Sequence, residues 1–196
     1  MTSSAFPRRC ALVTGATQGI GLAIAERLAA AGCDLVLHGI ERPETGEAVA
    51  TALAQRLGAR VADVQADLAD EPAAAGLVAR ATEALRAPDI LVNNAGIQHT
   101  CPIEDFPTTR WNAILAVNLS AAFLTMRAAV PGMRERGWGR IVNIASVHGL
   151  VASVNKSAYL AAKHGLVGLS KGSTGAQEPL KPAVPVRTTF TSPAAN

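Results

Sequence analysis

The segment ALVTGATQGIGLAIAERLAAA, residues 11–31, decides the fold. Its first four residues, Ala11–Thr14, have the apolar character of a short buried strand, and the glycine-rich turn Gly15–Gly21 follows at once. Residues 22–31 are rich in alanine and leucine, which favour a helix. A strand, a glycine-rich turn and a helix in this order are typical of a nucleotide-binding unit.

The glycines of this turn favour a ligand that carries phosphate groups. Gly15, Gly19 and Gly21 have no side chains, so the backbone can approach a pyrophosphate closely. The following helix offers unpaired N–H groups and the positive end of its dipole at its N-terminus. The spacing is Gly-x3-Gly-x-Gly rather than Gly-x-Gly-x-x-Gly, and an ordinary glycine-rich turn between a strand and a helix remains the alternative interpretation.

Strand and helix patterns alternate along the rest of the chain. Strands are expected at 34–38, 60–65, 90–93 and 140–145, and helices at 44–57, 72–85, 111–136 with a break at Pro131, and a last one carrying Tyr159 and running to about Lys171. Because crossovers between parallel strands are right-handed, this order places helices on both faces of a parallel sheet. We therefore expect an α/β fold, a Rossmann-like doubly wound sheet of five parallel strands with ligands at their carboxyl ends.

Three reactive side chains follow the last expected strand. Ser146 ends the apolar run 140–145, where its hydroxyl would lie at the carboxyl edge of the sheet. Tyr159 and Lys163 are four residues apart and therefore share one face of a helix. A cation this close favours the phenolate and suits a tyrosine to proton transfer. A Tyr-x-x-x-Lys pair alone is weak evidence and is more often a solvated helix face. Its significance here depends on the nucleotide-binding pattern that precedes it in the chain.

Composition restricts the class of protein. The 196 residues predict one domain, and an apolar content of 49% predicts a globular core. A net charge of +3 and an aromatic content of 4% argue against a nucleic-acid partner. Cys10, Cys33 and Cys101 lack the spacing of metal ligands, so we expect free thiols and no metal site. Neither a secretion signal nor a membrane span is expected, which makes the cytoplasm the expected location.

The last 25 residues depart from this pattern. Residues 172–196 contain four prolines and six serines or threonines, without a helical or strand period. Since proline removes backbone donors, we expect an irregular, disordered tail without a regular strand. The expected organisation is a nucleotide-binding domain at 8–171 followed by this tail at 172–196.

Several motifs in this order resemble the short-chain dehydrogenase/reductase family: Thr14-Gly15-x3-Gly19-x-Gly21, Asp67-Leu68, Asn93-Asn94-Ala95-Gly96, Asn118, Ser146 and Tyr159-x3-Lys163. The resemblance runs from about residue 8 to about residue 171. It implies an oxidoreductase that transfers hydride reversibly between a secondary alcohol and a nicotinamide cofactor. It also implies a homo-oligomer formed through the long helix from Trp111. Family members continue with two further strands and a lid, so we expect a fold truncated at its C-terminal end. A shifted or shortened reading frame is the favoured explanation, and a divergent tail is the alternative.

The resemblance assigns roles to individual residues. Tyr159 would act as base and acid, Lys163 would support it and bind the nicotinamide ribose, and Ser146 would hold the substrate oxygen. Asn118 would order a water, although without the resemblance it is a plain helix residue. The residues implied in cofactor binding are Gly15, Gly19, Ile20 and Gly21 at the phosphates, Asp67 and Leu68 at the adenine, and Asn94, Ala95, Gly96, Tyr159 and Lys163 near the ribose. Asp67 alone could equally be a helix N-cap.

A narrower resemblance concerns the substrate. Residues 97–100, 103–107, 148–153 and 155–159 resemble the family members that interconvert 3-hydroxybutyrate and acetoacetate. It implies that Gln98, His148 and Lys156 pair with a substrate carboxylate, beside Ser146 and Tyr159 at the reacting oxygen, and that the cofactor is NAD. Neither an acid nor an arginine ends the strand at 34–38, and Glu41 and Arg42 come just beyond it. The alternatives are an inactive or merely nucleotide-binding remnant, and a family member acting on another class of substrate.

Overall fold

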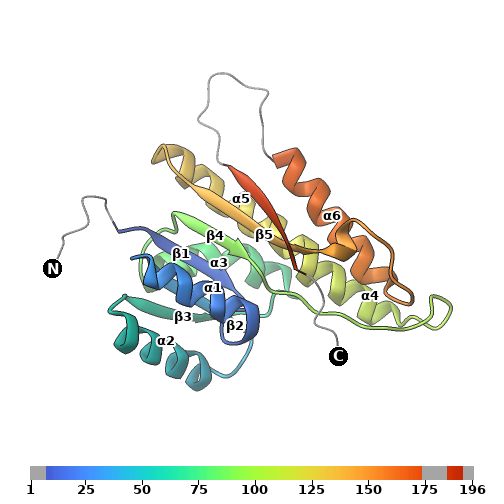
Figure 1. Cartoon of the computed structure of the whole chain (residues 1–196), viewed down its shortest axis with the longest axis horizontal. Coiled ribbons are helices and arrows are strands. Elements are labelled where there is room, and N and C mark those ends of the chain that lie inside the picture. Colours follow the sequence, from blue (N-terminus) through green and yellow to red (C-terminus); the bar gives the residue numbers. More distant parts are fainter. Residues whose placement is uncertain (1–7, 174–184, 192–196) are drawn as a thin grey trace.

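A computed structural model describes residues 8–173 and 185–191 of the chain. In chain order the elements are β1 (Cys10–Thr14), α1 (Gly19–Ala30), β2 (Asp34–Gly39), α2 (Pro43–Leu57), β3 (Val61–Gln65), α3 (Glu71–Ala84), β4 (Ile90–Asn93), α4 (Thr108–Leu115), η1 (Ala116–Ser120), α5 (Ala121–Glu135), β5 (Arg140–Ser146), η2 (Val147–Gly149), α6 (Ser157–Ser173) and β6 (Val186–Thr191). Within this part of the chain, the strands form one 6-stranded sheet in the order β3-β2-β1-β4-β5-β6 (Figure 1). All pairings are parallel, so the doubly wound α/β fold is confirmed.

Successive residues of β1 face the two layers of helices. Ala11 and Val13 belong to the apolar cluster that includes side chains of α1 and α2. Leu12 belongs to the cluster on the other face, formed with α3 and α5. β1 lies between β2 and β4 and is buried over its whole length. A continuous apolar run rather than an alternating one is therefore what this central strand requires.

The long apolar helix predicted at 111–136 is present, but the expected break at Pro131 is wrong. Helical structure runs without interruption from Thr108 to Glu135, with Pro131 inside α5. Proline removes one backbone donor from the helical ladder. Met133, two residues further on, is fully buried in the core, and its packing keeps the last turn in place.

The same helix is long and apolar enough to cross a membrane by length and composition. Its most apolar stretch is 44% buried inside the protein. Leu124, Met126 and Met133 belong to the core cluster that covers one face of the sheet. This burial is typical of the core helix of a globular fold.

The expectation that no strand follows Lys171 is wrong. Residues Val186–Thr191 form β6, which pairs in parallel with β5 from Ile141↔Val186 to Ser146↔Thr191. The run Val-Arg-Thr-Thr-Phe-Thr is rich in β-branched residues and contains no proline, and the neighbouring edge of β5 supplies backbone partners. The sheet therefore has one strand more than expected. Residues 174–184 and 192–196, which also belong to the predicted tail, lie outside the described residues.

A chain of buried amide and hydroxyl groups joins α5, β4, β5 and α6. The Thr125 hydroxyl donates to Asn93 Oδ1 at 2.8 Å, and Asn93 Nδ2 donates to Asn143 Oδ1 at 2.9 Å. Asn143 Nδ2 donates to Ser170 Oγ at 2.9 Å. All four residues are buried, so each hydrogen bond replaces one that water would otherwise make.

This chain of hydrogen bonds predicts the effect of removing one hydroxyl. Thr125→Val keeps the shape of the side chain but leaves Asn93 Oδ1 buried without a donor, so the free energy of unfolding should fall by about 1–3 kcal/mol. Thr82→Val is the matched control, because the Thr82 hydroxyl donates to the Val78 carbonyl one turn back on the surface of α3. Its cost should be about 0.5 kcal/mol or less. Chemical denaturation followed by circular dichroism measures both, and equal losses would contradict the interpretation.

Candidate functional site

The glycine-rich turn between β1 and α1 depends on backbone geometry that side chains would prevent. Gly15 has a φ of +61° and Gly19 a φ of +56°, in the left-handed region that favours glycine. A Cβ on Gly21 would overlap the carbonyl oxygen of Gly15. The first turn of α1 therefore packs directly on the backbone that leaves β1.

The N-terminus of α1 is open to an anion. Its N-cap residue Gln18 makes no side-chain capping hydrogen bond, and its first turn contains no acidic residue. The first N–H groups of a helix have no partner within the helix. Together with the helix dipole, they form a site that suits phosphate.

Asn94 ties the end of β4 to this turn. Its Nδ2 donates to the carbonyl oxygens of Thr14 at 2.9 Å and Gly15 at 3.0 Å. The Thr14 hydroxyl in turn accepts from the N–H groups of Asn94 at 2.9 Å and Ala95 at 3.0 Å. The structure thus brings two predicted motifs, far apart in sequence, into direct contact.

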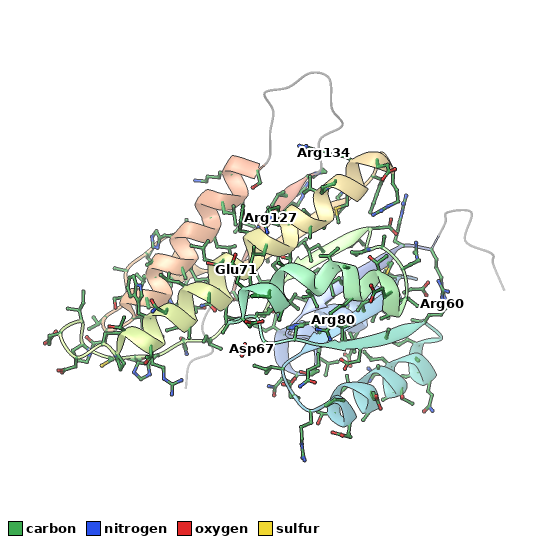
Figure 2. The ribbon with its side chains drawn as sticks, turned by 180° about the vertical axis from the view of Figure 1, so that it is seen from behind. Arg60, Asp67, Glu71, Arg80, Arg127 and Arg134 are labelled. Atoms are coloured by element: carbon green, nitrogen blue, oxygen red, sulfur yellow. The ribbon has the colours of Figure 1, made fainter. Side chains whose placement is uncertain are left out.

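A groove of about 400 Å³ opens at the carboxyl ends of the strands beside this turn. Of the predicted cofactor residues, those that line it are Gly15, Ile20, Asp67, Leu68, Asn94, Ala95 and Gly96. Gly19 and Gly21 shape the turn itself. Asp67 lies just before α3 (Figure 2) and accepts from the Ala69 N–H at 2.8 Å. The alternative role of Asp67 as a helix N-cap is wrong, because Asp70 caps α3.

Glu41 also lines the groove, although it is not among the cofactor-binding residues expected from the sequence. Its Oε2 accepts from the Thr17 hydroxyl at 2.8 Å, and its Oε1 lies 3.5 Å from Gln18 Nε2. Burial by itself raises the pKa of Glu41, but hydrogen bonds from backbone N–H groups and from Thr17 outweigh it, so the pKa is lowered. An acid two residues beyond a strand end was the available signal, but only the fold shows that it turns back toward Thr17.

Ser146 and Tyr159 are linked through His148. Ser146, the last residue of β5, is 2% exposed, and its Oγ accepts from the His148 N–H at 3.2 Å. The His148 ring packs edge-on against the Tyr159 ring, with centroids 6.1 Å apart. The structure therefore brings together three residues predicted to contact the substrate.

Lys163 lies beneath this cluster. It is 4% exposed, and its Nζ donates to the Ile144 carbonyl at 2.8 Å and lies 5.6 Å from the centroid of the Tyr159 ring. Burial lowers the pKa of Lys163 to about 8. The ammonium form therefore still predominates at neutral pH, in contact with the tyrosine that it is predicted to support.

Asn118 lies in η1, a π-helical turn, and is 2% exposed rather than on a plain helix surface. Its Oδ1 accepts from the Ile97 N–H and its Nδ2 donates to the Ile97 carbonyl, both at 2.8 Å. A Cβ on Gly96 would lie 3.3 Å from Asn118 Oδ1 and 3.7 Å from Lys163 Nζ. Asn118 and Lys163 thus meet beside the loop that follows β4. Single π-turns inside α-helices are frequent at functional sites.

The two remaining predicted substrate residues lie on adjoining loops. Gln98 is exposed on the loop after β4, and Lys156 is half-buried just before α6. The Cys101 N–H donates to the Asn155 carbonyl at 2.8 Å, which holds the two loops together. The structure places these side chains near the site without giving them a common contact, and their roles stay predictions.

Comparisons with known proteins agree with this geometry. Residues 9–193 match the family model described as short chain dehydrogenase. The chain is 50% identical to the D-beta-hydroxybutyrate dehydrogenase of Cupriavidus necator and 49% identical to that of Rhizobium meliloti, in each case over 163 residues.

These alignments cover 83% of this chain and 62% and 63% of the two relatives. The crystal structure of acetoin dehydrogenase YohF from Salmonella typhimurium has a TM-score of 0.81 and 36% identity, over 86% of this chain and 66% of that one. The chain thus spans a little under two thirds of the length of these proteins. Its fold, its motifs and these similarities establish that it belongs to the short-chain dehydrogenase family.

Proposed function

We propose that the chain carries the cofactor and catalytic part of an NAD-dependent dehydrogenase that interconverts 3-hydroxybutyrate and acetoacetate. The observation that carries this proposal is the buried Lys163 ammonium, which lies over the Tyr159 ring and bonds the Ile144 carbonyl of the strand that ends at Ser146, at the sheet edge that also opens into the nucleotide groove. A general base, a supporting cation and a hydroxyl donor beside a phosphate-binding turn suit hydride transfer from an alcohol.

The open N-terminus of α1 and the groove beside it fit a dinucleotide. When bound, its nicotinamide supplies a hydride acceptor. Tyr159, as the phenolate that the Lys163 ammonium favours, would take the proton of the substrate hydroxyl and become a neutral phenol. The Ser146 Oγ already accepts from His148, so its own hydrogen is free to donate to the substrate oxygen.

Asn118 has a different part in this proposal. Both ends of its amide are engaged by the backbone of Ile97, so its side chain holds the loop of Gly96 and Ile97 in place. This loop forms the wall between the nucleotide groove and Lys163. Asn118 would therefore hold the loop beside the site, and its role in ordering a proton-relay water stays a prediction.

The substrate assignment rests on the names of the relatives and on the residues available for a carboxylate. The two relatives at 50% and 49% identity are D-beta-hydroxybutyrate dehydrogenases. His148, Gln98 and Lys156 can each donate a hydrogen bond to a carboxylate. A neutral hydroxyketone such as acetoin is the second candidate class, since the acetoin dehydrogenase has the same fold at 36% identity. A nucleotide-binding remnant without turnover is the third.

Self-association through the helix that starts at Thr108 belongs to the same proposal. Phe123 of α5 is 46% exposed on the outer side of this helix. The Arg127 guanidinium lies 5.5 Å from the centroid of its ring. An exposed aromatic ring of this size suits a helix-to-helix contact between copies.

The first test concerns proton transfer. Purified chain is assayed for NADH formation at 340 nm with D-3-hydroxybutyrate, and with acetoin as the competing substrate. Tyr159→Phe should lower kcat by a factor of about 10²–10⁴ while NADH affinity changes little, because the phenol acts in proton transfer. His164→Ala, on the exposed side of α6, is the matched control and should retain the activity of the unaltered chain.

Equal rates for the unaltered chain and for Tyr159→Phe would contradict the proposed role of Tyr159. A chain that binds NADH without oxidising either alcohol is the remnant. Oxidation of acetoin alone would assign the chain to the second candidate class, that of neutral substrates.

The second test concerns the choice of NAD over NADP. Glu41 places a carboxylate at the groove beside Thr17, where it can accept from ribose hydroxyls and would repel a 2′-phosphate. Glu41→Gln should weaken NADH binding about tenfold, because the charged hydrogen bond to the ribose hydroxyls is lost. It should strengthen NADPH binding, because the repulsion between the carboxylate and the 2′-phosphate is lost.

Glu44→Gln, in the exposed first turn of α2, is the matched control and should leave both affinities unchanged. Fluorescence titration with each reduced cofactor measures the preference. An unchanged ratio of the two affinities in Glu41→Gln would contradict the assignment of ribose recognition to Glu41.

A further inference from the structure

His38 is buried between the glycine-rich turn and the end of β3, and both nitrogens of its ring have partners. The residue is 3% exposed and lies next to the last residue of β2. Its Nδ1 lies 3.2 Å from the Gly15 backbone nitrogen, which donates to it. Its Nε2 lies 3.1 Å from the Ala66 carbonyl oxygen.

These two contacts together fix the protonation of the ring. The Gly15 N–H can donate only to a nitrogen that carries a lone pair, so Nδ1 must be unprotonated. The Ala66 carbonyl can only accept, so Nε2 must carry the hydrogen. One state satisfies both, the neutral ring with its hydrogen on Nε2.

Of the two partners of His38, Gly15 lines the groove and Ala66 adjoins two residues that line it. Gly15 starts the turn that leads into α1, and Ala66 directly precedes Asp67 and Leu68 of the groove lining. The His38 carbonyl also accepts from the Ala16 N–H at 2.8 Å. His38 therefore holds two successive N–H groups of the turn and connects them to the end of β3.

We propose that His38 is a positioning residue for dinucleotide binding, whose neutral ring holds the glycine-rich turn in the form that accepts phosphate. Protonation of His38 Nδ1 places an N–H group against the Gly15 N–H. The hydrogen bond that holds the turn to the ring is then lost. Affinity for the dinucleotide consequently declines in acid. This inference rests on the proposed nucleotide-binding function and adds a residue to that site.

The surroundings of the ring favour the neutral form. Burial lowers the pKa of His38 and outweighs the hydrogen bond to the Ala66 carbonyl and the Glu41 carboxylate, which both raise it, while the Arg80 guanidinium lowers it further. Arg80 projects from α3 beside β3 (Figure 2), and Glu41 follows the end of β2. Asp67, after β3, is engaged with the Ala69 N–H, and the turn and the adjoining end of β1 carry no charged side chain.

The sign of the pH dependence follows from this lowered pKa. In the unfolded chain a histidine titrates at about 6.5. As the pH falls below that value, the unfolded chain takes up a proton before the folded chain does. The stabilisation by the neutral ring is therefore complete above about pH 6.5 and is lost as the pH falls through the folded value. Dinucleotide binding, which needs the same neutral ring, declines in the same direction.

Two substitutions separate the two contacts of the ring. His38→Asn keeps an acceptor near the place of Nδ1 and does not titrate. The side-chain NH₂ group of His38→Gln can reach the Ala66 carbonyl. This variant places no acceptor where Nδ1 of the histidine meets the Gly15 N–H. NADH affinity is measured by fluorescence between about pH 5 and pH 8, the range in which histidine titrates. His164→Asn, on exposed α6, is the control for histidine substitution as such.

The unaltered chain and His164→Asn should lose NADH affinity on the acid side. His38→Gln should bind about tenfold more weakly at pH 8 than the unaltered chain, because the Gly15 N–H is left without an acceptor. His38→Asn should bind more tightly than His38→Gln and should lose the acid decline. Parallel pH profiles for the unaltered chain and His38→Asn would overturn the inference.

A measurement without nucleotide separates this inference from the proposed function. In the ¹⁵N spectrum of the free chain, His38 Nδ1 should show the shift of an unprotonated nitrogen at neutral pH, and the Gly15 amide signal should titrate with the same midpoint as the His38 ring. A Gly15 signal that does not follow the ring would overturn the inference. Absence of NADH binding at every pH would defeat the proposed function, and the coupling between Gly15 and His38 would still decide the role of the histidine.

Discussion

The backbone of Gly15 is the point on which the rest of the site depends. Its carbonyl accepts from Asn94 and packs against the Cα of Gly21, and its N–H donates to His38. β1, β2, β4 and α1 thus meet at one residue. Because Gly21 has no side chain, α1 begins in contact with this residue, and its free N–H groups are aimed across the end of β1.

Ser146, Tyr159 and Lys163, the residues predicted for catalysis, are held at the same sheet by a different set of contacts. β5 carries Ser146 at its end and offers the Ile144 carbonyl to Lys163 of α6. Deeper in the core, Asn143 of the same strand bonds Asn93 of β4 and Ser170 of α6. Paired amides and hydroxyls are stable in a core only in one relative position, so they fix α6 on the sheet. The groove beside the glycine-rich turn and the residues predicted for catalysis are therefore parts of one hydrogen-bonded frame.

The order of the elements could be predicted because its signals are local. The expected strand at 90–93 coincides with β4 (Ile90–Asn93), and the expected helix at 44–57 differs from α2 (Pro43–Leu57) by one residue. Apolar runs, glycine stops and an early proline lie within each segment. The errors concern segments whose structure is decided by neighbours. β6 forms because the edge of β5 offers it backbone partners, and Pro131 stays helical because Met133 is packed in the core.

For the site, the sequence alone determined the residue types and their spacing. Three glycines shape the turn between β1 and α1, and Tyr159 and Lys163 share one helix face, because these properties follow from backbone geometry over a few residues. Only the tertiary structure decided which distant groups meet. Glu41 turns back to Thr17, His38 bridges Gly15 and Ala66, and Asn118 holds Ile97. Such contacts join segments that lie more than twenty residues apart, and their partners are set by the packing of strands and helices, which no local pattern records.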